Sequence, residues 1–245
     1  MDLVSIGILI VVILFICVLL VKRFVYFHPS KLILPLIENF EEIYEGNLHA
    51  LYSKGTNNKI IVYCHGNYGN VTTRQDKIIN LNKLGFSVLI FDYNGYGKSK
   101  GVPNESMCYN NGDTFIAYIL RNGFTKDEII LYGEGIGGCV ASYLAVKYGI
   151  NVLILESALP SIKLLLKSYN SILSIFGVIF NEFNTEKFLN YYKGKLLVIH
   201  SVHDEIIPYK IIDCLKQKAT LFLDSIGNHS NVQIDWDQVK NFLNS

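Results

Sequence analysis

Glycine-rich turns carrying His, Asp or Glu side chains follow several short apolar segments of this 245-residue chain. The first is HGNYGN at residues 65–70. A turn of this kind that leads into a helix offers backbone N–H groups, which suit either a phosphate or a developing oxyanion. Three further turns also contain glycine: DYNGYGKS at 92–99, GEGIGG at 133–138 and GNHS at 227–230. A fourth, SVHDEIIP at 201–208, has no glycine but carries His, Asp and Glu. The chemistry of this protein is expected at these turns.

The segments before the turns predict a mainly parallel sheet with helices on both faces, an α/β fold. Continuous apolar runs alternate with stretches of helical period, which is typical of buried parallel strands joined by helices. Ligands bind at the carboxyl ends of such strands. The strands are expected near 59–65, 86–92, 128–133, 151–156, 195–201 and 219–224, with an antiparallel edge strand at 48–53. The helices are expected near 72–84, 106–122, 136–148, 208–218 and 235–244.

Composition excludes several classes of protein. A net charge of +1 gives no electrostatic reason for a nucleic-acid partner. Half of the residues are hydrophobic, so the chain can bury a large core and is not disordered. Five cysteines without a CxxC pair, and no Cys/His cluster at ligand spacing, argue against a disulfide scaffold and a zinc site. We therefore expect no metal and no cofactor.

The N-terminal residues 1–23 predict a single-pass membrane anchor. Residues 3–21 carry no charge and would span about 28 Å as a helix. A cleaved signal peptide is the alternative, but Asp2 precedes the run and bulky Lys22-Arg23-Phe24 follows it. The positive charge after the span places the following domain in the cytoplasm. Residues 24–47 are assigned to a connector and 48–245 to one α/β domain.

The turns also resemble, in order, the motifs of the α/β-hydrolase superfamily. The matching segments cover about 180 residues: HGNYGN, FDYNGYGKSKG, LYGEGIGG, LES, IHSVHDEIIP and GNHS. Among its branches, the chain looks most like membrane-anchored, single-domain serine hydrolases that act on lipid esters or acylated proteins. The resemblance therefore implies a bilayer and an acyl, lipid or acylated-protein ligand as partners.

The resemblance also implies a role for individual residues. In this superfamily a serine on a strained strand-to-helix elbow, G-x-S-x-G, is followed in the chain by an acid and then a histidine. Asp204 matches the acid and His229 the base, while the backbone N–H of Ile136, with that of Asn67 or Tyr68, matches the oxyanion hole. The chain departs from the pattern at the nucleophile, where it has Gly135.

Glycine at position 135 removes the side chain that would form an acyl-enzyme. It also adopts the strained elbow conformation at little cost and leaves room for a water molecule. Cys139, Ser99 and Ser201 are the alternative nucleophiles to consider. Cys139 lies one helical turn further on and is expected to pack against the sheet instead. Ser99 and Ser201 lie on other loops, with nothing in their spacing that brings them opposite His229.

Other polar residues at strand ends have simpler structural interpretations. His65 is expected to bond to the backbone, and Asp92 and Glu156 to cap loops or helices. His200 and His203 are interpreted as structural histidines, since neither has a metal-ligating partner at a useful spacing.

Residues 157–193 occupy the position of the superfamily's cap. They include many apolar side chains that are unsuited to a solvated helix pair: Ile172, Leu173, Ile175, Phe176, Val178, Ile179, Phe180 and Phe183. A cap packed on its own sheet and a wall for an acyl chain both explain them, and both remain open. Two functions remain open as well: a pseudo-hydrolase that binds such a ligand without covalent turnover, or an active ester or thioester hydrolase in which His229 and Asp204 activate a water molecule.

Overall fold

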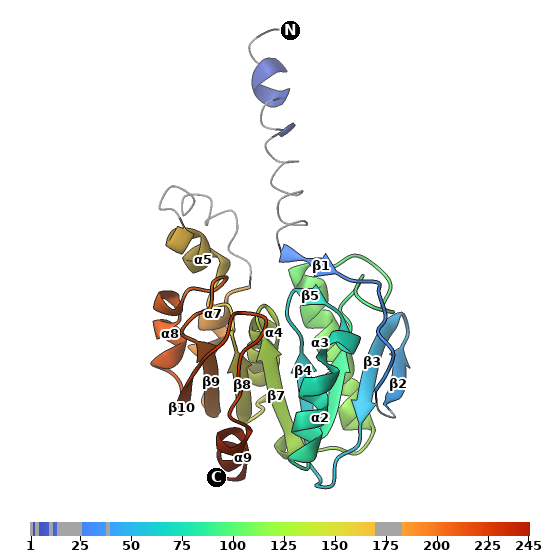
Figure 1. The fold of residues 1–245 in the computed structure, drawn as a ribbon. Coiled ribbons are helices and arrows are strands. Elements are labelled where there is room, and N and C mark those ends of the chain that lie inside the picture. The colour runs from blue at the N-terminus through green and yellow to red at the C-terminus, as the bar shows by residue number, and fades with distance from the viewer. Residues whose placement is uncertain (1, 3–4, 10–11, 14–25, 38–39, 170–182) are drawn as a thin grey trace.

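The computed structural model describes residues 2, 5–9, 12–13, 26–37, 40–169 and 183–245. Its main sheet has eight strands in the order β10-β9-β8-β7-β4-β6-β3-β2 (Figure 1). The strands β4 and β6 to β10 are parallel, whereas β2 and β3 are antiparallel to their neighbours. Their bounds are β2 Glu41–Glu45, β3 Leu48–Ser53, β4 Ile60–Cys64, β6 Ser87–Phe91, β7 Ile129–Glu134, β8 Val152–Glu156, β9 Lys195–Ser201 and β10 Leu221–Ser225.

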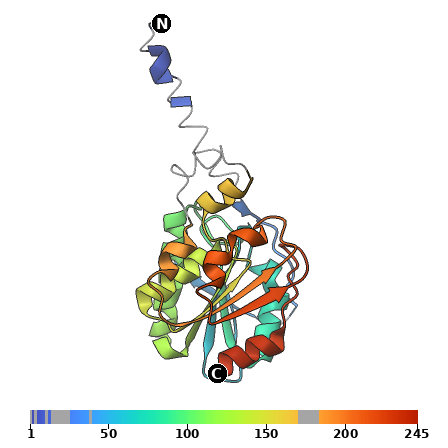
Figure 2. The ribbon, with the colours of Figure 1, turned by 90° about the vertical axis from the view of Figure 1, so that its left-hand side faces the viewer.

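Helices cover both faces of this sheet, as the sequence predicted (Figure 2). The helices α2 (Gln75–Lys83) and α9 (Trp236–Asn244) pack on one face, and α3 (Glu105–Arg121) and α4 (Gly137–Tyr148) on the other. Alternate residues of a strand point to opposite faces. In β4, Ile61 and Tyr63 therefore join the core under α2 and α9, while Ile60, Val62 and Cys64 join the core under α3 and α4.

The antiparallel edge differs from the prediction. Strand β3 is antiparallel as expected, but it lies between β6 and β2 and is not the edge strand. The edge is β2, whose five residues belong to the segment assigned to the connector. Only Ile43 of β2 is buried, because one face of this edge strand is open to solvent. A single buried side chain leaves too little periodicity for the strand to be recognised in the sequence.

A second, two-stranded sheet lies at the edge where the parallel strands end (Figure 1). In it, β1 (His28–Pro29) pairs in parallel with β5 (Tyr68–Gly69), which belongs to the turn after β4. A 3₁₀ turn, η1 (Val71–Arg74), then leads into α2.

The predicted membrane anchor, residues 1–23, and the predicted cap, residues 157–193, are only partly within the described residues. No helix among the described residues is long and apolar enough to cross a membrane, and most of the predicted anchor lies outside them. In the predicted cap, α5 (Ile162–Tyr169) and α7 (Thr185–Leu189) are described, whereas residues 170–182 are not. Of the apolar cap residues named above, only Phe183 is described. It is fully buried, with its ring 5.8 Å from that of Phe27.

Candidate active site

The predicted nucleophile elbow is the turn between β7 and α4. Its apex, Gly135, has a φ of +55°, in the left-handed region that costs a side-chain-bearing residue energy. The Gly135 N–H donates to the carbonyl of Glu156 at 3.1 Å, and its own carbonyl accepts from Leu159 at 3.1 Å. The apex is therefore fixed from the neighbouring strand β8.

Small residues let helix α4 begin directly against the sheet. A Cβ atom on Gly137 would overlap the carbonyl of Cys64, and one on Gly138 would lie 2.5 Å from the Ala158 side chain. An ideal Cβ on Gly135, by contrast, meets only the Cα of Gly66, at 3.6 Å. A side chain would therefore fit at the apex, whereas it would not fit at Gly137 or Gly138.

Asp204 and His229 lie together at the ends of neighbouring strands, β9 and β10. His229 Nδ1 is 2.8 Å from Asp204 Oδ2. The other carboxylate oxygen, Oδ1, accepts from the N–H groups of Ile206 and Ile207 at 3.0 and 2.7 Å. With Nδ1 donating to this held carboxylate, Nε2 of His229 is left to act as a base.

The pKa values of the two groups shift in opposite directions. Burial disfavours the charged imidazole, but the hydrogen bond and charge of Asp204 outweigh it, so the pKa of His229 lies above its ordinary value. Burial alone would raise the pKa of Asp204, yet its bond to His229 and the N–H of Ile207 lower it. The carboxylate therefore stays ionised beside the imidazole.

Of the other histidines considered, only His200 lies near the pair, with its Nε2 3.6 Å from Asp204 Oδ2. His200 donates from Nε2 to the carbonyl of Ile207 at 2.9 Å, and burial lowers its pKa. His65 is fully buried against Tyr93, with Nδ1 2.7 Å from the carbonyl of Gly66, and burial lowers its pKa to about 4. His203 is exposed.

The predicted oxyanion-hole residues lie around the elbow. Ile136 is the N-terminal cap of α4, directly after the apex. The turn carrying Asn67 and Tyr68 approaches from β4, where Gly66 is the neighbour of the Gly135 apex. The carbonyl of Asn67 is held by the hydroxyl of Tyr96 at 2.8 Å, which fixes the orientation of the following peptide.

A polar pocket of about 430 Å³ lies beside His229. Arg74, Lys77 and Glu134 line it, and two ion pairs join these residues to one another and to Glu156: Arg74 to Glu134 at 2.7 Å, and Lys77 to Glu156 at 2.6 Å. Burial would raise the pKa of Glu134, but the charges of Arg74 and Lys77 outweigh it and hold the pKa well below its ordinary value. Glu134 is therefore ionised at neutral pH.

This network is the part of the site that sequence reasoning missed. Glu156 was expected to cap a loop or helix, but it accepts from Lys77 and from the hydroxyl of Tyr132, at 2.6 Å each. The register pairs Glu134 with Glu156 on adjacent strands. The sequence did offer a signal for these ion pairs. Two acidic residues stand at the ends of neighbouring strands, and two basic residues, Arg74 and Lys77, lie one helical turn apart.

The alternative nucleophiles are placed elsewhere. Cys139 is fully buried, its sulfur 3.2 Å from the hydroxyl of Tyr109, and burial raises the pKa of its thiol. The hydroxyl of Ser99 donates to the carbonyl of Asp92, and that of Ser201 to the carbonyl of Gly227. In the described part of the chain, no group of three His, Cys, Asp or Glu residues is arranged to hold a metal ion.

Comparison with known families agrees with this geometry. The family model for serine aminopeptidase S33 matches residues 55–205, which include the elbow and the acid. The chain belongs to this family of the α/β-hydrolase superfamily. The match stops before His229, so the prediction that His229 is the base rests on the sequence resemblance and on its pairing with Asp204.

Relatives and solved structures of this hydrolase family extend over most of the chain. An uncharacterised protein of Acanthamoeba polyphaga mimivirus, R595, is 32% identical over 86% of this chain and 82% of its own length. An uncharacterised membrane protein of Saccharomyces cerevisiae, YNL320W, is 29% identical over 66% of this chain, which spans only 62% of that relative. The Pyrococcus furiosus esterase Pf2001 shares the fold, with a TM-score of 0.72 at 16% identity, covering 89% of this chain and 96% of that one.

Proposed function

We propose that this family member is a membrane-anchored pseudo-hydrolase, which binds an acyl or lipid ligand, or an acylated protein, without covalent turnover. The observation that carries the proposal is the pairing of an ordered acid and base, 2.8 Å apart, with an elbow whose apex is Gly135. An acyl-enzyme requires a nucleophilic side chain at the apex, and glycine has none. The chain would therefore keep the ligand-binding site of a hydrolase but could not form the covalent acyl-enzyme.

Anchoring to a membrane, with the α/β domain on the cytoplasmic side, is supported by the sequence. The apolar residues 3–21 and the basic residues that follow them favour this orientation. The name of the yeast relative, which calls it a membrane protein, agrees with an anchor. An anchored domain meets its ligand at the bilayer, which favours lipid-bearing molecules over small soluble esters.

A second function, hydrolysis by water, is favoured by the open space at the apex. Only the Cα of Gly66 lies within 4 Å of the position where a Cβ would be. A water molecule there would give its proton to His229 and attack a bound ester directly. Hydrolases that lose one triad member keep a rate about 10³–10⁴ above the uncatalysed reaction, so such turnover would be slow.

Three forms of the full chain in detergent micelles separate these functions: the natural sequence, Gly135→Ser and His229→Ala. Each is assayed for hydrolysis of esters and thioesters and for labelling by a fluorophosphonate. The pseudo-hydrolase proposal expects an inert natural sequence, and a Gly135→Ser variant that gains at least about 10²-fold in rate and is labelled. Turnover by the natural sequence that His229→Ala abolishes would instead establish the water mechanism.

A further inference from the structure

The segment that leads from the N-terminal region into the domain is bonded to the turn that carries the predicted oxyanion hole. We call residues 26–37 the strap. Its strand β1 pairs with β5, so that the His28 N–H donates to the carbonyl of Asn67 at 2.9 Å. The Ser30 N–H donates to the carbonyl of Gly69 at 3.1 Å. These two bonds bracket Tyr68, one of the residues expected to stabilise the oxyanion.

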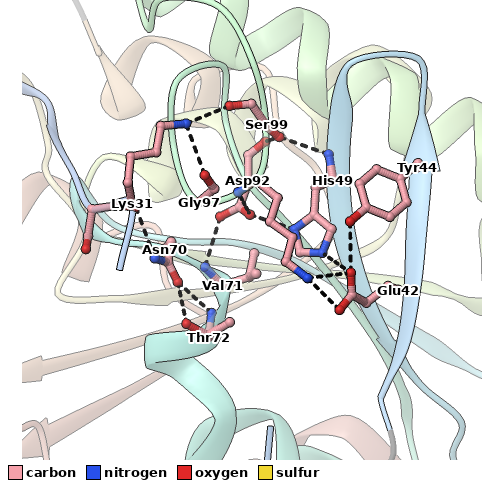
Figure 3. Close-up of polar contacts among 12 residues, drawn as sticks. Lys31, Glu42, Tyr44, His49, Asn70, Val71, Thr72, Asp92, Gly97 and Ser99 are labelled. Carbon is pink, nitrogen blue, oxygen red and sulfur yellow. Dashed lines mark hydrogen bonds and ion pairs between the residues drawn. The ribbon is translucent and has the colours of Figure 1, made fainter. Parts of the chain in front are cut away.

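Asn70 joins the strap to the same turn through its side chain (Figure 3). It is fully buried, and its Nδ2 donates to the carbonyls of Ser30 at 3.1 Å and Leu32 at 2.8 Å. Its Oδ1 accepts from the N–H and the hydroxyl of Thr72, at 2.9 and 2.6 Å, and so caps η1. Without the strap, both bonds donated by Nδ2 would be lost, while the two bonds that Oδ1 accepts from Thr72 would remain.

Lys31 extends the connection to the loop after β6. Its Nζ donates to the carbonyls of Gly97 at 3.0 Å and Ser99 at 2.9 Å (Figure 3). The Gly97 N–H returns a bond to the carbonyl of Ser30 at 3.1 Å. The strap is therefore fastened on two sides, by Asn70 to the turn after β4 and by Lys31 to the loop after β6.

Asp92 closes the ring between these two loops. It is fully buried at the end of β6, and it accepts from the N–H of Val71 at 3.0 Å and that of Lys98 at 3.2 Å. His49 Nδ1 lies 2.7 Å from the same carboxylate (Figure 3). The expected capping role of Asp92 is thus visible, since it holds the first residue of η1.

Preorganisation explains why this ring matters to the site. Backbone N–H groups stabilise a developing oxyanion only if they are held in place before the reaction. Strand β5 has two residues, and β1 is its partner in the described structure. Without β1, the carbonyls of Asn67 and Tyr68 would keep side-chain bonds from Tyr96 and Arg74, but the two-residue strand would lose all its bonds to a neighbouring strand.

We propose that the strap is a positioning element for the oxyanion loop at residues 66–70, with Lys31 as its fastening to the loop after β6. The site is then incomplete without a segment that lies directly after the apolar N-terminus. This inference rests on the proposed function, because it assigns the strap to the same ligand-binding site. The strap positions the loop and does not touch the polar pocket.

Hydrogen exchange of the full chain in micelles tests the proposal without any need for turnover. The variants are Lys31→Met, which removes the two Nζ bonds to the loop after β6, and Ser30→Pro, which removes the N–H donor to Gly69. The controls are Leu32→Ala, at an exposed side chain of the strap, and Lys210→Met, at an exposed lysine with no polar contact among the described residues. We expect about tenfold faster exchange in peptides covering 66–74 for both strap variants and no change in the controls.

The location of the change decides the outcome. Faster exchange confined to 66–74, with strands β7 and β8 unchanged, supports a positioning role. Unchanged exchange at 66–74, or an equal increase across the sheet, would overturn it. An inactive Gly135→Ser variant would refute the proposed function, but it would leave this exchange measurement unaffected.

A kinetic measurement separates positioning from binding. In the Gly135→Ser background, Lys31→Met is expected to lower kcat for ester hydrolysis about tenfold and to change KM by less than twofold. The reason is that oxyanion stabilisation acts in the transition state and not on the bound ester. A raised KM with an unchanged kcat would contradict the assignment.

Discussion

Replacing Gly135 by serine should lower the free energy of unfolding, and the size of the loss should depend only on the backbone conformation at this position. The φ of +55° is unfavourable for any residue with a Cβ, by about 1–2 kcal/mol. No steric cost is added, since the nearest atom to the new Cβ is 3.6 Å away. For a domain of this size, about 1 kcal/mol lowers Tm by about 2–4 °C. We therefore expect Gly135→Ser to lower Tm by about 2–8 °C.

Gly149 offers a matched control at the other end of the same helix. Its φ is +67°, and no atom lies within 4 Å of its ideal Cβ. Gly149→Ser should therefore lower Tm by the same amount as Gly135→Ser, but without any gain of esterase activity or fluorophosphonate labelling. Thermal unfolding followed by circular dichroism, with all variants in one detergent, measures the difference.

A second comparison tests the packing around the apex. A Cβ on Gly137 would overlap the carbonyl of Cys64, so Gly137→Ser should cost at least about 3 kcal/mol or prevent folding. The reasoning is refuted if Gly135→Ser is as damaging as Gly137→Ser. It is refuted equally if Gly135→Ser leaves Tm unchanged while Gly149→Ser lowers it, because the apex would then not be in the left-handed region.

Three further outcomes follow from the charges and thiol of the site. Asp204 stabilises the ionised form of His229, so the pair's contribution to the free energy of unfolding is fully present below pH 6.5 and is lost as the pH rises through the raised pKa of His229. His229→Ala should therefore lower the urea midpoint more at pH 6 than at pH 9. An equal loss at both pH values would count against the pair. Arg74→Met and Glu134→Gln should each lower the free energy of unfolding by about 2–4 kcal/mol, because each leaves its partner's charge unpaired. The double variant should lose at least about 1 kcal/mol less than the sum of the two single losses. Additive losses would show that the two residues do not stabilise each other. Cys139 should resist iodoacetamide in the native protein for hours and react after unfolding, because burial raises the pKa of its thiol; rapid native alkylation would reopen it as a nucleophile.

The sequence by itself determined the architecture, a mostly parallel sheet covered by helices. Parallel strands buried on both faces have to be continuous apolar runs, so they stand out from the helices between them. Polar residues of the site follow these runs directly, because the carboxyl ends of parallel strands meet at one edge of the sheet. The pairing of Asp204 with His229 followed from the resemblance, and the structure places them 2.8 Å apart.

Only the tertiary structure decided how the edges and the loops are joined. Strand β2 buries Ile43 alone, so its pattern is too weak to read. The ion pairs of Arg74 and Lys77 join residues 57 to 79 positions apart, and no local periodicity reports such contacts. The strap is held by backbone bonds to the turn after β4 and by side chains, such as those of Lys31 and Asn70, that donate to backbone carbonyls. Because the bonded groups lie far apart in the sequence and meet only where the chain returns in space, sequence patterns did not reveal that residues 26–37 are bonded to this turn.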